Sequence, residues 1–415
     1  MSHNSEAERL AAERLLSSAA VRERAAEMLE IGLGGTLPHF RIDAARLGPT
    51  ADFVAGVIRD NYPDLNVPLH ARWRHFVFGK RDLWAEIDQA GQWPDANARA
   101  RAAFDLAIIS VLLDAGAGPD WRYTDAVTGA VVGRSEGLAL ASLRMFQAGL
   151  FSSDPRRPLR VDDDRLADLT SDDLAKGFQV SATNPLAGLD GRAALLARLG
   201  RAMRDNLKVF AKRDTARPGG LFDHLAGLAE DRILPAPAIL HALLLHLGPI
   251  WPARLTLGGV SLGDTWRHSA IKRDDVTNGL VPLHKLSQWL SYSLIEPLRD
   301  AGIAVSDIDG LTGLAEYRNG GLLVDSGVIV LRDAAQAALP QPVESELVVE
   351  WRALTVALLD RLAPLVRDRL GVTPQKFPLG ALLEGGTWAA GRRIAREKRA
   401  DGGPPLNIVS DGTVF

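Results

Sequence analysis

The stretch that decides the fold class is ESELVVEWRALTVALLD, residues 344–360. Its apolar residues recur in nearly every direction around a helical axis, and a helix that is apolar all round is usually buried. Glu350 and Arg352 would then lie inside the protein, where an unpaired charge is costly. The pattern therefore leaves two interpretations open: these residues hold a structural ion pair, or they reach a functional cavity.

Helical patterns also dominate the rest of the chain, and strand patterns are few and short. The hairpin expected at 121–133 has Thr128-Gly129 as its turn. We therefore predict a mainly α protein, an orthogonal helical bundle with a few short strands. An N-terminal helical lobe with a small hairpin is expected over 1–150, and a C-terminal helical lobe carrying the site over 151–415, together forming one compact two-lobed unit. Helices are expected over residues 5–31, 99–113, 136–148, 192–211, 237–247, 283–301, 344–370 and 379–400.

Charge and composition indicate a small-molecule partner. The 48 basic and 51 acidic residues give a formal net charge of −3, without a long run of one sign. A protein that binds duplex nucleic acid normally shows a basic stripe. We therefore expect a nucleoside-like or nucleotide-like ligand and no nucleic-acid partner, and we predict no oligomeric state.

The chain has no cysteine, which excludes disulfides, thiolate nucleophiles and cysteine-based zinc sites. The most apolar stretch, Ile233–Trp251, is broken by prolines and is too short to span a bilayer. Residues 1–17 are charged and lack the apolar centre of a signal peptide. We expect a cytoplasmic location and no membrane partner.

Familiar catalytic signatures are missing: the sequence has no Walker loop, dinucleotide fingerprint, nucleophile-elbow serine or HExxH. His241 and His246 are five residues apart and point to different faces of a helix. We therefore expect no metal and no cofactor.

Two further polar stretches allow both a structural and a functional interpretation. Along 283–301, Lys285, Gln288 and Tyr292 lie opposite a leucine stripe, so they form either an exposed face or the wall of a cleft. In GLTGLAEYRNGGLLVDSG (310–327), a polar cluster around Glu316 lies between apolar runs. That cluster is either an exposed turn or a buried group with a purpose.

Several stretches of the chain carry a family resemblance: GGTLPHF (34–40), HARWRHF (70–76), SEGLALASLRMFQAGLF (135–151), LGDTWRHSA (262–270), LVPLHKLSQWLSYSLIEPL (280–298), GLTGLAEYRNGGLLVDSGV (310–328), EWRALTVALLD (350–360), GGTWAAGR (385–392) and SDGTVF (410–415). With them, the run from Leu33 to Phe415 resembles the uracil-catabolism protein family, known in yeasts as uracil catabolism protein four and uracil-regulated protein three. That family carries a domain of unknown function, and the resemblance implies a role in converting uracil through a nucleotide and a ribosylurea compound to urea.

The second half contains, in this order, the stretches KLSQ (285–288), LTGLAEYRNGG (311–321) and EWRA (350–353). They are more distantly similar to K-R-A-Q, L-T-x-F-A-D-Y-R-V-P-Q and E-I-R-A of the queuosine-salvage nucleotide N-glycosidases, which occur in the same order. The resemblance implies a DNA-glycosylase-like fold in the second half. Glu316 replaces the family's aspartate, and Asn319-Gly-Gly replaces its V-P-Q, which should open the pocket wall and indicates a different leaving group.

The two resemblances together suggest an N-glycosidase that hydrolyses a ribosylurea-type compound, as its 5′-phosphate, to urea and ribose phosphate. Such a reaction places positive charge on the anomeric carbon, and we expect Glu316 to stabilise it or to activate water. The leaving group needs a proton donor, for which Asp325, Lys285 and Glu350 are candidates.

Cationic side chains would hold the phosphate of this substrate. Arg72, Arg74 and His75 are the first candidates and Arg318 is another, because guanidinium groups match phosphate geometry. The alternative for Arg72 and Arg74 is that they pair with carboxylates. The remaining expected substrate-binding residues are Asp264, Trp266, Gln288, Tyr292, Tyr317, Glu350 and Arg352.

Two other functions stay open. One is an amidohydrolase that opens a ureido C–N bond and leaves the sugar bond intact. The other is a non-catalytic binding or scaffold protein of the same pathway.

Overall fold

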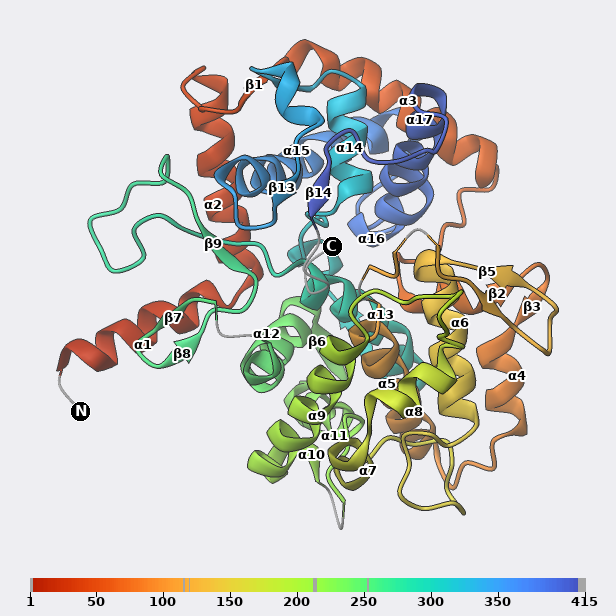
Figure 1. Cartoon of the computed structure of the whole chain (residues 1–415). Helices are drawn as coiled ribbons and strands as arrows, with labels where there is room; N and C mark the ends of the chain where they lie inside the picture. Colours follow the sequence, from red (N-terminus) through yellow and green to blue (C-terminus); the bar gives the residue numbers. More distant parts are fainter. Residues whose placement is uncertain (1–2, 115, 119, 212–214, 252–253, 410–415) are drawn as a thin grey trace. The chain divides into compact units, whose positions relative to one another are not determined.

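The computed structural model describes residues 3–114, 116–118, 120–211, 215–251 and 254–409 (Figure 1). The described chain is mainly α-helical, and its strands are two or three residues long and associate only in pairs. The predicted fold class is therefore confirmed, whereas the DNA-glycosylase-like character stays a prediction. The final SDGTVF segment lies outside the described residues.

The chain divides into two compact units, each built from separate segments. Among the described residues, unit 1 takes those of 1–70, 253–288 and 307–414, and unit 2 those of 71–252 and 289–306. The expected boundary near residue 150 falls within unit 2. The division passes through helix α13 (Lys285–Asp300), between Gln288 and Trp289.

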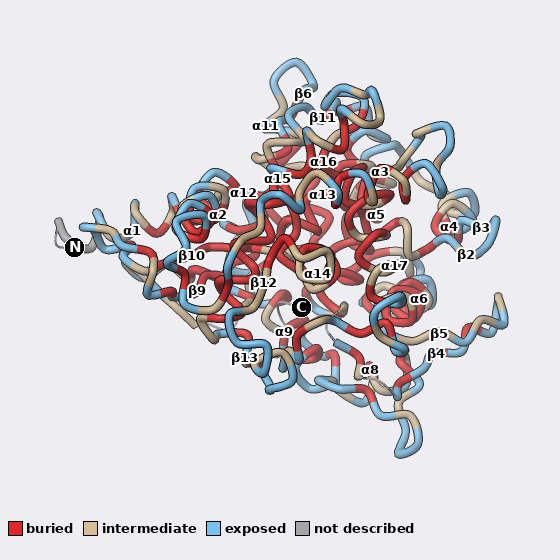
Figure 2. Tube along the Cα trace, turned by 90° about the horizontal axis from the view of Figure 1, so that it is seen from above, coloured by how far each residue is buried: buried red, intermediate tan, exposed pale blue. Residues whose placement is uncertain are grey.

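Unit 1 is organised around the helix α15, which contains the stretch that indicated a buried helix. Ser345 caps its N-terminus by accepting the Val348 N–H, and Gly371 ends it with φ of 69°. Most of its residues up to Leu359 are buried, as Figure 2 shows. It continues through Pro364. The helices of unit 1 besides α13 are α1 (His3–Leu15), α2 (Ser18–Leu33), η1 (Ala44–Arg46), α3 (Leu47–Asn61), η4 (Ile308–Gly310), α14 (Tyr317–Asp325), η5 (Ala334–Ala337), α15 (Glu346–Leu370), α16 (Leu379–Ala381), the π-helix η6 (Leu382–Trp388) and α17 (Ala389–Lys398).

The helix expected over 5–31 is two helices. Ser17 interrupts it, because its side chain accepts the N–H of Ala20 at 3.2 Å and caps α2. Helices α2 and α3 both pack against α15, and α17 packs against α14 (Figure 1).

Short strand pairs join distant segments of unit 1. The antiparallel pair β9–β10 aligns Trp266 with Val281 and so brings residues 264–268 next to the start of α13. The antiparallel pair β1–β12 aligns Phe40 with Leu331. The strands of unit 1 are β1 (Phe40–Ile42), β7 (Thr256–Leu257), β8 (Val260–Ser261), β9 (Thr265–Arg267), β10 (Leu280–Pro282), β12 (Ile329–Leu331), β13 (Gln341–Pro342) and β14 (Ile408–Val409).

Unit 2 packs around the long buried helix α5, with α6 and α11 against it. The predicted hairpin is present as β4 and β5, and Gly129 adopts φ of 70° in its turn. The helices are η2 (Arg72–Phe76), α4 (Leu83–Ala90), α5 (Ala96–Leu112), α6 (Arg134–Gln147), α7 (Asp163–Asp168), α8 (Ser171–Gly177), α9 (Leu189–Asp205), α10 (Leu207–Phe210), α11 (Gly220–Leu228), α12 (Ala236–Leu247) and η3 (Gly248–Ile250). The strands are β2 (Val77–Phe78), β3 (Arg81–Asp82), β4 (Tyr123–Thr124), β5 (Val131–Val132), β6 (Ile233–Pro235) and β11 (Ala304–Ser306).

None of the helices in the described part of the chain is long and apolar enough to cross a bilayer.

Candidate functional site

A buried ion pair between Asp264 and Arg352 forms the centre of the candidate site in unit 1. Both terminal nitrogens of Arg352 donate to the two carboxylate oxygens of Asp264, each at 2.8 Å. The Arg352 side chain is 1% exposed and the Asp264 side chain 12%. This bidentate geometry fixes the plane of both groups.

Asp264 also organises the start of helix α13. Its carboxylate accepts the backbone N–H of Lys285 at 2.9 Å and the indole N–H of Trp266 at 2.6 Å. Burial by itself would raise the pKa of Asp264, but the Arg352 guanidinium and these donors hold that pKa below its usual value. Asp264 is therefore an ionised carboxylate, and it joins three of the expected site residues in one network.

The same network reaches Glu316. The Nε of Arg352 donates to the carbonyl oxygen of Ala315 at 3.1 Å, and Glu316 follows as the N-cap of α14. Glu316 is 8% exposed, and its two oxygens accept the backbone N–H groups of Arg318 at 2.7 Å and Asn319 at 2.6 Å. A carboxylate here also interacts favourably with the helix dipole. Each oxygen keeps a second lone pair for a ligand or water.

Two buried amide side chains bind the segment just before Glu316. Gln288 accepts the N–H of Thr312 at 3.2 Å, and the Asn319 amide donates to the carbonyl of Leu314 at 3.3 Å. The remaining atoms of these amides, Gln288 Nε2 and Asn319 Oδ1, are buried and have no hydrogen-bond partner within the described ranges. Unpaired buried polar atoms are rare in native proteins. These two side chains therefore leave one donor and one acceptor without a partner in the described part of the chain.

Glu350 and Arg352 do not pair with each other. Glu350 is fully buried, accepts the N–H of Phe40 at 2.8 Å and lies 3.3 Å from Nε2 of His268. Arg352 and Glu350 thus each meet a partner from the segment 262–270. Glu350 fixes strand β1 and is not part of the hydrogen-bond network that leads to Glu316.

Asp325 lies at the far end of α14 from Glu316. Arg399 donates to both of its oxygens, at 2.8 and 2.6 Å. At 1.5 Å per residue, the eight steps from Tyr317 to Asp325 correspond to about 12 Å. The structure therefore does not place Asp325 beside Glu316, and its carboxylate is held in an ion pair.

The AEYRNGG segment is closely packed and not open. A Cβ added to Gly320 would lie 2.7 Å from the ring of Trp351, and one added to Gly321 would lie 3.1 Å from Pro405. The expectation that Asn319-Gly-Gly opens the pocket wall is therefore wrong, because neighbouring rings fill the space. Arg318 donates to the carbonyl of Gly402 at 2.7 Å and stacks 4.8 Å from the ring centre of Tyr317.

Arg72, the first expected phosphate ligand, is a structural residue of unit 2. It is fully buried and donates to Asp114 and to the hydroxyl and carbonyl oxygens of Ser110. It also stacks 5.4 Å from the ring centre of Trp289, and burial lowers its pKa. A guanidinium held in this way does not reach a ligand, so this expectation is corrected.

The other expected residues of unit 2 also have partners there. Arg74 pairs with Glu296 at 2.6 Å, the alternative that the sequence had left open. The ring of His75 contacts that of Trp289 at 5.7 Å, and Tyr292 is fully buried.

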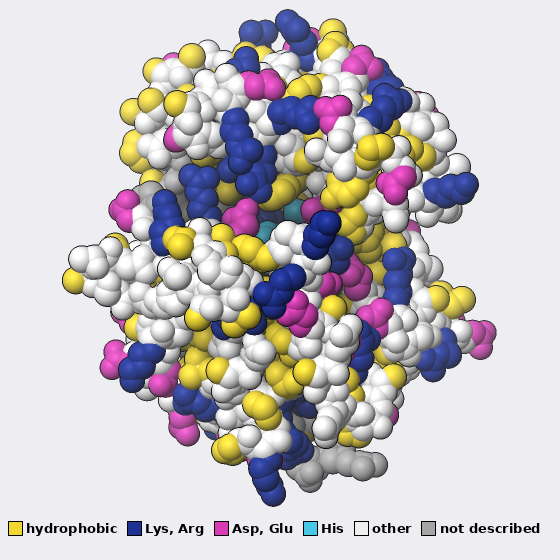
Figure 3. Space-filling view, turned by 90° about the vertical axis from the view of Figure 1, so that its right-hand side faces the viewer, with side chains coloured by type: hydrophobic (Ala, Val, Ile, Leu, Met, Phe, Trp, Pro, Cys, Tyr) yellow, Lys and Arg dark blue, Asp and Glu magenta, His cyan; other side chains and the backbone are white. Residues whose placement is uncertain are grey.

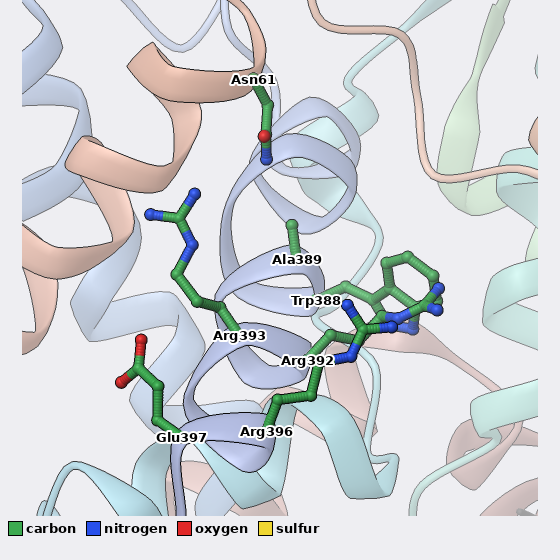
Figure 4. A pocket seen from close by; sticks show the side chains of 7 residues that line it. All are labelled: Asn61, Trp388, Ala389, Arg392, Arg393, Arg396 and Glu397. Carbon is green, nitrogen blue, oxygen red and sulfur yellow. The ribbon is translucent and has the colours of Figure 1, made fainter. Parts of the chain in front are cut away.

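A surface hollow in unit 1 contains basic residues that the site prediction did not include. It has a volume of about 480 Å³ and is lined by Asn61, Trp388, Ala389, Arg392, Arg393, Arg396 and Glu397 (Figure 4). Most of these residues lie on α17, which follows the π-helix η6 without a break. Over the described residues, His, Asp and Glu do not form a group of three or more that could hold a metal ion.

Comparison with known proteins identifies the family. A family model described as "Protein of unknown function (DUF1688)" matches residues 14–415. The chain belongs to this family. It is 40% identical over 414 residues to "Protein urg3" of Schizosaccharomyces pombe, covering 97% of this chain and 98% of that one. It is 39% identical over 412 residues to "Uracil catabolism protein 4" of Lachancea kluyveri, covering 91% and 92%. The predicted uracil-catabolism family is confirmed, and the similarity to queuosine-salvage glycosidases stays a prediction.

The site prediction had left out four residues, and the sequence indicated some of them more clearly than others. Arg392, Arg393 and Arg396 stand in or just after GGTWAAGR, and their helical spacing was visible. The unpaired amide atom of Asn319 had no sequence signal, because it depends on how the chain packs.

Proposed function

We propose that this protein acts in uracil catabolism as an N-glycosidase-like hydrolase. Its substrate is a ribosylurea-type N-riboside carrying a 5′-phosphate, and its products are urea and ribose phosphate. The name of the relative "Uracil catabolism protein 4", which aligns over nearly the whole chain, supports the pathway. The reaction type is supported by the groups around Glu316.

The observation that carries the proposal is the fixed, buried carboxylate of Glu316. Its two oxygens are held by two backbone N–H groups, and the residue before it is held by Arg352. A pre-positioned negative charge in a site with little water stabilises a developing cation more strongly than the same charge in water.

The hydrolysis assigns one task to each group. The C–N bond at the anomeric carbon breaks, its electron pair goes to the leaving nitrogen, and the sugar becomes oxocarbenium-like. Glu316 stabilises this charge and accepts a proton from the water whose oxygen bonds to the anomeric carbon. The leaving nitrogen takes a proton from Lys285, at the start of α13. A positioned donor of this kind contributes about 10²–10⁴-fold.

In this proposal the two amide side chains hold the ureido group of the substrate. Gln288 Nε2 donates to the ureido carbonyl, and Asn319 Oδ1 accepts from a ureido N–H. Both buried atoms would then be satisfied, and the leaving group would be held in one orientation.

The direct test is release of urea from ribosylurea 5′-phosphate by the purified protein. Urea and ribose 5-phosphate should form in equal amounts, and Glu316→Gln should lower kcat by at least about 10²-fold, since it removes the charge and keeps the shape. Asp95→Asn is the matched control, because Asp95 caps α5 by accepting the N–H of Ala98 at 2.7 Å. It should retain full activity.

Absence of urea above background with folded protein would overturn the proposal. Product masses that retain the ribosyl bond would instead indicate an amidohydrolase. A Glu316→Gln variant with undiminished pathway function would indicate a binding or scaffold protein.

A further inference from the structure

The helix α17 presents a pair of arginines that the reaction chemistry above does not use. Arg392 and Arg396 are four residues apart, so they lie on one face of the helix. Like charges at this spacing destabilise an isolated helix. The helix dipole favours a cation in the last turn, such as Arg396, but does not account for Arg392 further back.

Aromatic packing orients this pair. The guanidinium of Arg392 stacks 4.8 Å from the ring centre of Trp388, one turn earlier. Trp388 is fixed in turn by the ring of His70 at 5.6 Å, and His70 bonds to Glu384 at 2.6 Å. A guanidinium held over an aromatic ring has fewer orientations open to it, and its fork of N–H donors suits a phosphate.

The acidic residue of the hollow lies away from the arginine pair. Figure 4 shows Trp388, Arg392 and Arg396 on one side of α17, with Arg393 and Glu397 on the other. Arg393 pairs with Asp60 at 2.7 Å. Arg396 is exposed and makes no hydrogen bond or ion pair with the described residues. Basic side chains also lie close together on the upper part of the face shown in Figure 3.

The hollow is linked to the Glu316 segment by a close helix contact. A Cβ added to Gly391 would lie 2.2 Å from the carbonyl oxygen of Arg318, so α17 touches the first turn of α14 at that point. Arg392 follows directly after this contact, and Glu316 begins the same turn of α14. The helix that lines most of the hollow is therefore packed against the helix that Glu316 caps.

We propose that Arg392 and Arg396 form a binding site for a phosphate monoester group, which a ribose 5-phosphate moiety supplies. Assigning this ester to the substrate rests on the proposed function, but phosphate binding itself does not. Two guanidinium groups neutralise a dianion with charge-assisted hydrogen bonds. The site takes the role that the sequence had given to Arg72 and Arg74.

Isothermal titration calorimetry of the full chain at low ionic strength tests this site with ribose 5-phosphate, inorganic phosphate and ribose. Both phosphates should bind, and ribose should not. Arg396→Gln should weaken binding of ribose 5-phosphate about tenfold, and the Arg392→Gln/Arg396→Gln pair more. Arg393→Gln is the matched control on the same helix, and it should change binding less than twofold. Circular dichroism confirms that each variant is folded.

Equal weakening by Arg393→Gln and Arg396→Gln would overturn the site, since it would indicate only general positive charge. Failure of either phosphate to bind would overturn it as well. The two proposals fail separately. Phosphate binding without urea release would support the phosphate site and overturn the proposed reaction. Urea release with an unchanged KM in Arg396→Gln would support the reaction and overturn the phosphate site.

Discussion

The Asp264–Arg352 pair allows the sharpest stability prediction. Replacing Asp264 by Asn removes the counter-charge of a guanidinium that is 1% exposed, while nearly preserving the shape of the side chain. Breaking a buried ion pair by removing one partner costs about 3–5 kcal/mol, because the other charge stays buried and uncompensated. The free energy of unfolding of Asp264→Asn should therefore fall by about 3–5 kcal/mol.

The matched control is an exposed ion pair on the same helix. Arg361 donates to Glu30 at 2.7 Å, and the two side chains are 53% and 65% exposed. Exposed pairs contribute about 0–1 kcal/mol, so Glu30→Gln should lower the unfolding free energy by less than about 1 kcal/mol. The two pairs differ in burial and in geometry, since the Asp264–Arg352 pair is bidentate.

Urea denaturation followed by circular dichroism and tryptophan fluorescence measures both effects from the midpoint and the slope. Since the chain has two units, the comparison uses the transition that shifts in each variant. The Asp264→Asn/Arg352→Met double variant should recover part of the loss, which gives a coupling energy of at least about 1 kcal/mol. A loss for Asp264→Asn no larger than that for Glu30→Gln, or strict additivity, would refute the reasoning.

Three further predictions concern single side chains. Gly391→Ala should lower the unfolding free energy by about 1–3 kcal/mol because its Cβ would meet the Arg318 carbonyl. The control is Gly56→Ala in α3, where nothing lies within 4 Å of the added Cβ, and it should be neutral or stabilising. If thermal melts showed that both variants change the stability in the same direction, the contact between Gly391 and Arg318 would be contradicted. Glu316→Ala should cost about 1 kcal/mol by removing the α14 cap, and unchanged urea denaturation would rule that cap out. Burial lowers the pKa of His246 from 6.5 to about 4, so stability present above pH 6.5 should be lost as the pH falls toward 4. His246→Gln should reduce this loss in melts at pH 7 and 4.5, and an identical pH dependence would show that His246 does not contribute.

Hydrophobic periodicity was enough to predict the helical class and the burial of α15, because both depend on local spacing. It did not predict the division of the first helix at Ser17, where one side-chain hydrogen bond ends the pattern. The sequence pattern also does not show how α15 continues through Pro364. A proline costs one backbone hydrogen bond, and the surrounding packing compensates for that loss.

The site was predicted in composition but not in pairing. Arg352 and Glu350 were correctly expected to be buried, but their partners Asp264 and His268 lie more than eighty residues earlier in the chain. Sequence spacing carries no information on such contacts. Arg72 shows the same limit. The sequence does not distinguish an arginine at the surface from a buried arginine that is paired with an aspartate, as Arg72 is with Asp114.

The segment 312–320 explains why these dispersed residues belong together. Gln288 binds it from α13, Arg352 and Trp351 bind it from α15, and α17 closes on it at Arg318. Each contact holds a backbone carbonyl or N–H group, so the position of the Glu316 carboxylate is determined by three helices and not by one flexible side chain. A catalytic group needs such support, because a displacement of about 1 Å can cost 10²-fold in rate. The same contacts would be superfluous for an exposed turn, which was the other interpretation of this stretch. They favour a segment that presents one charge at one fixed point.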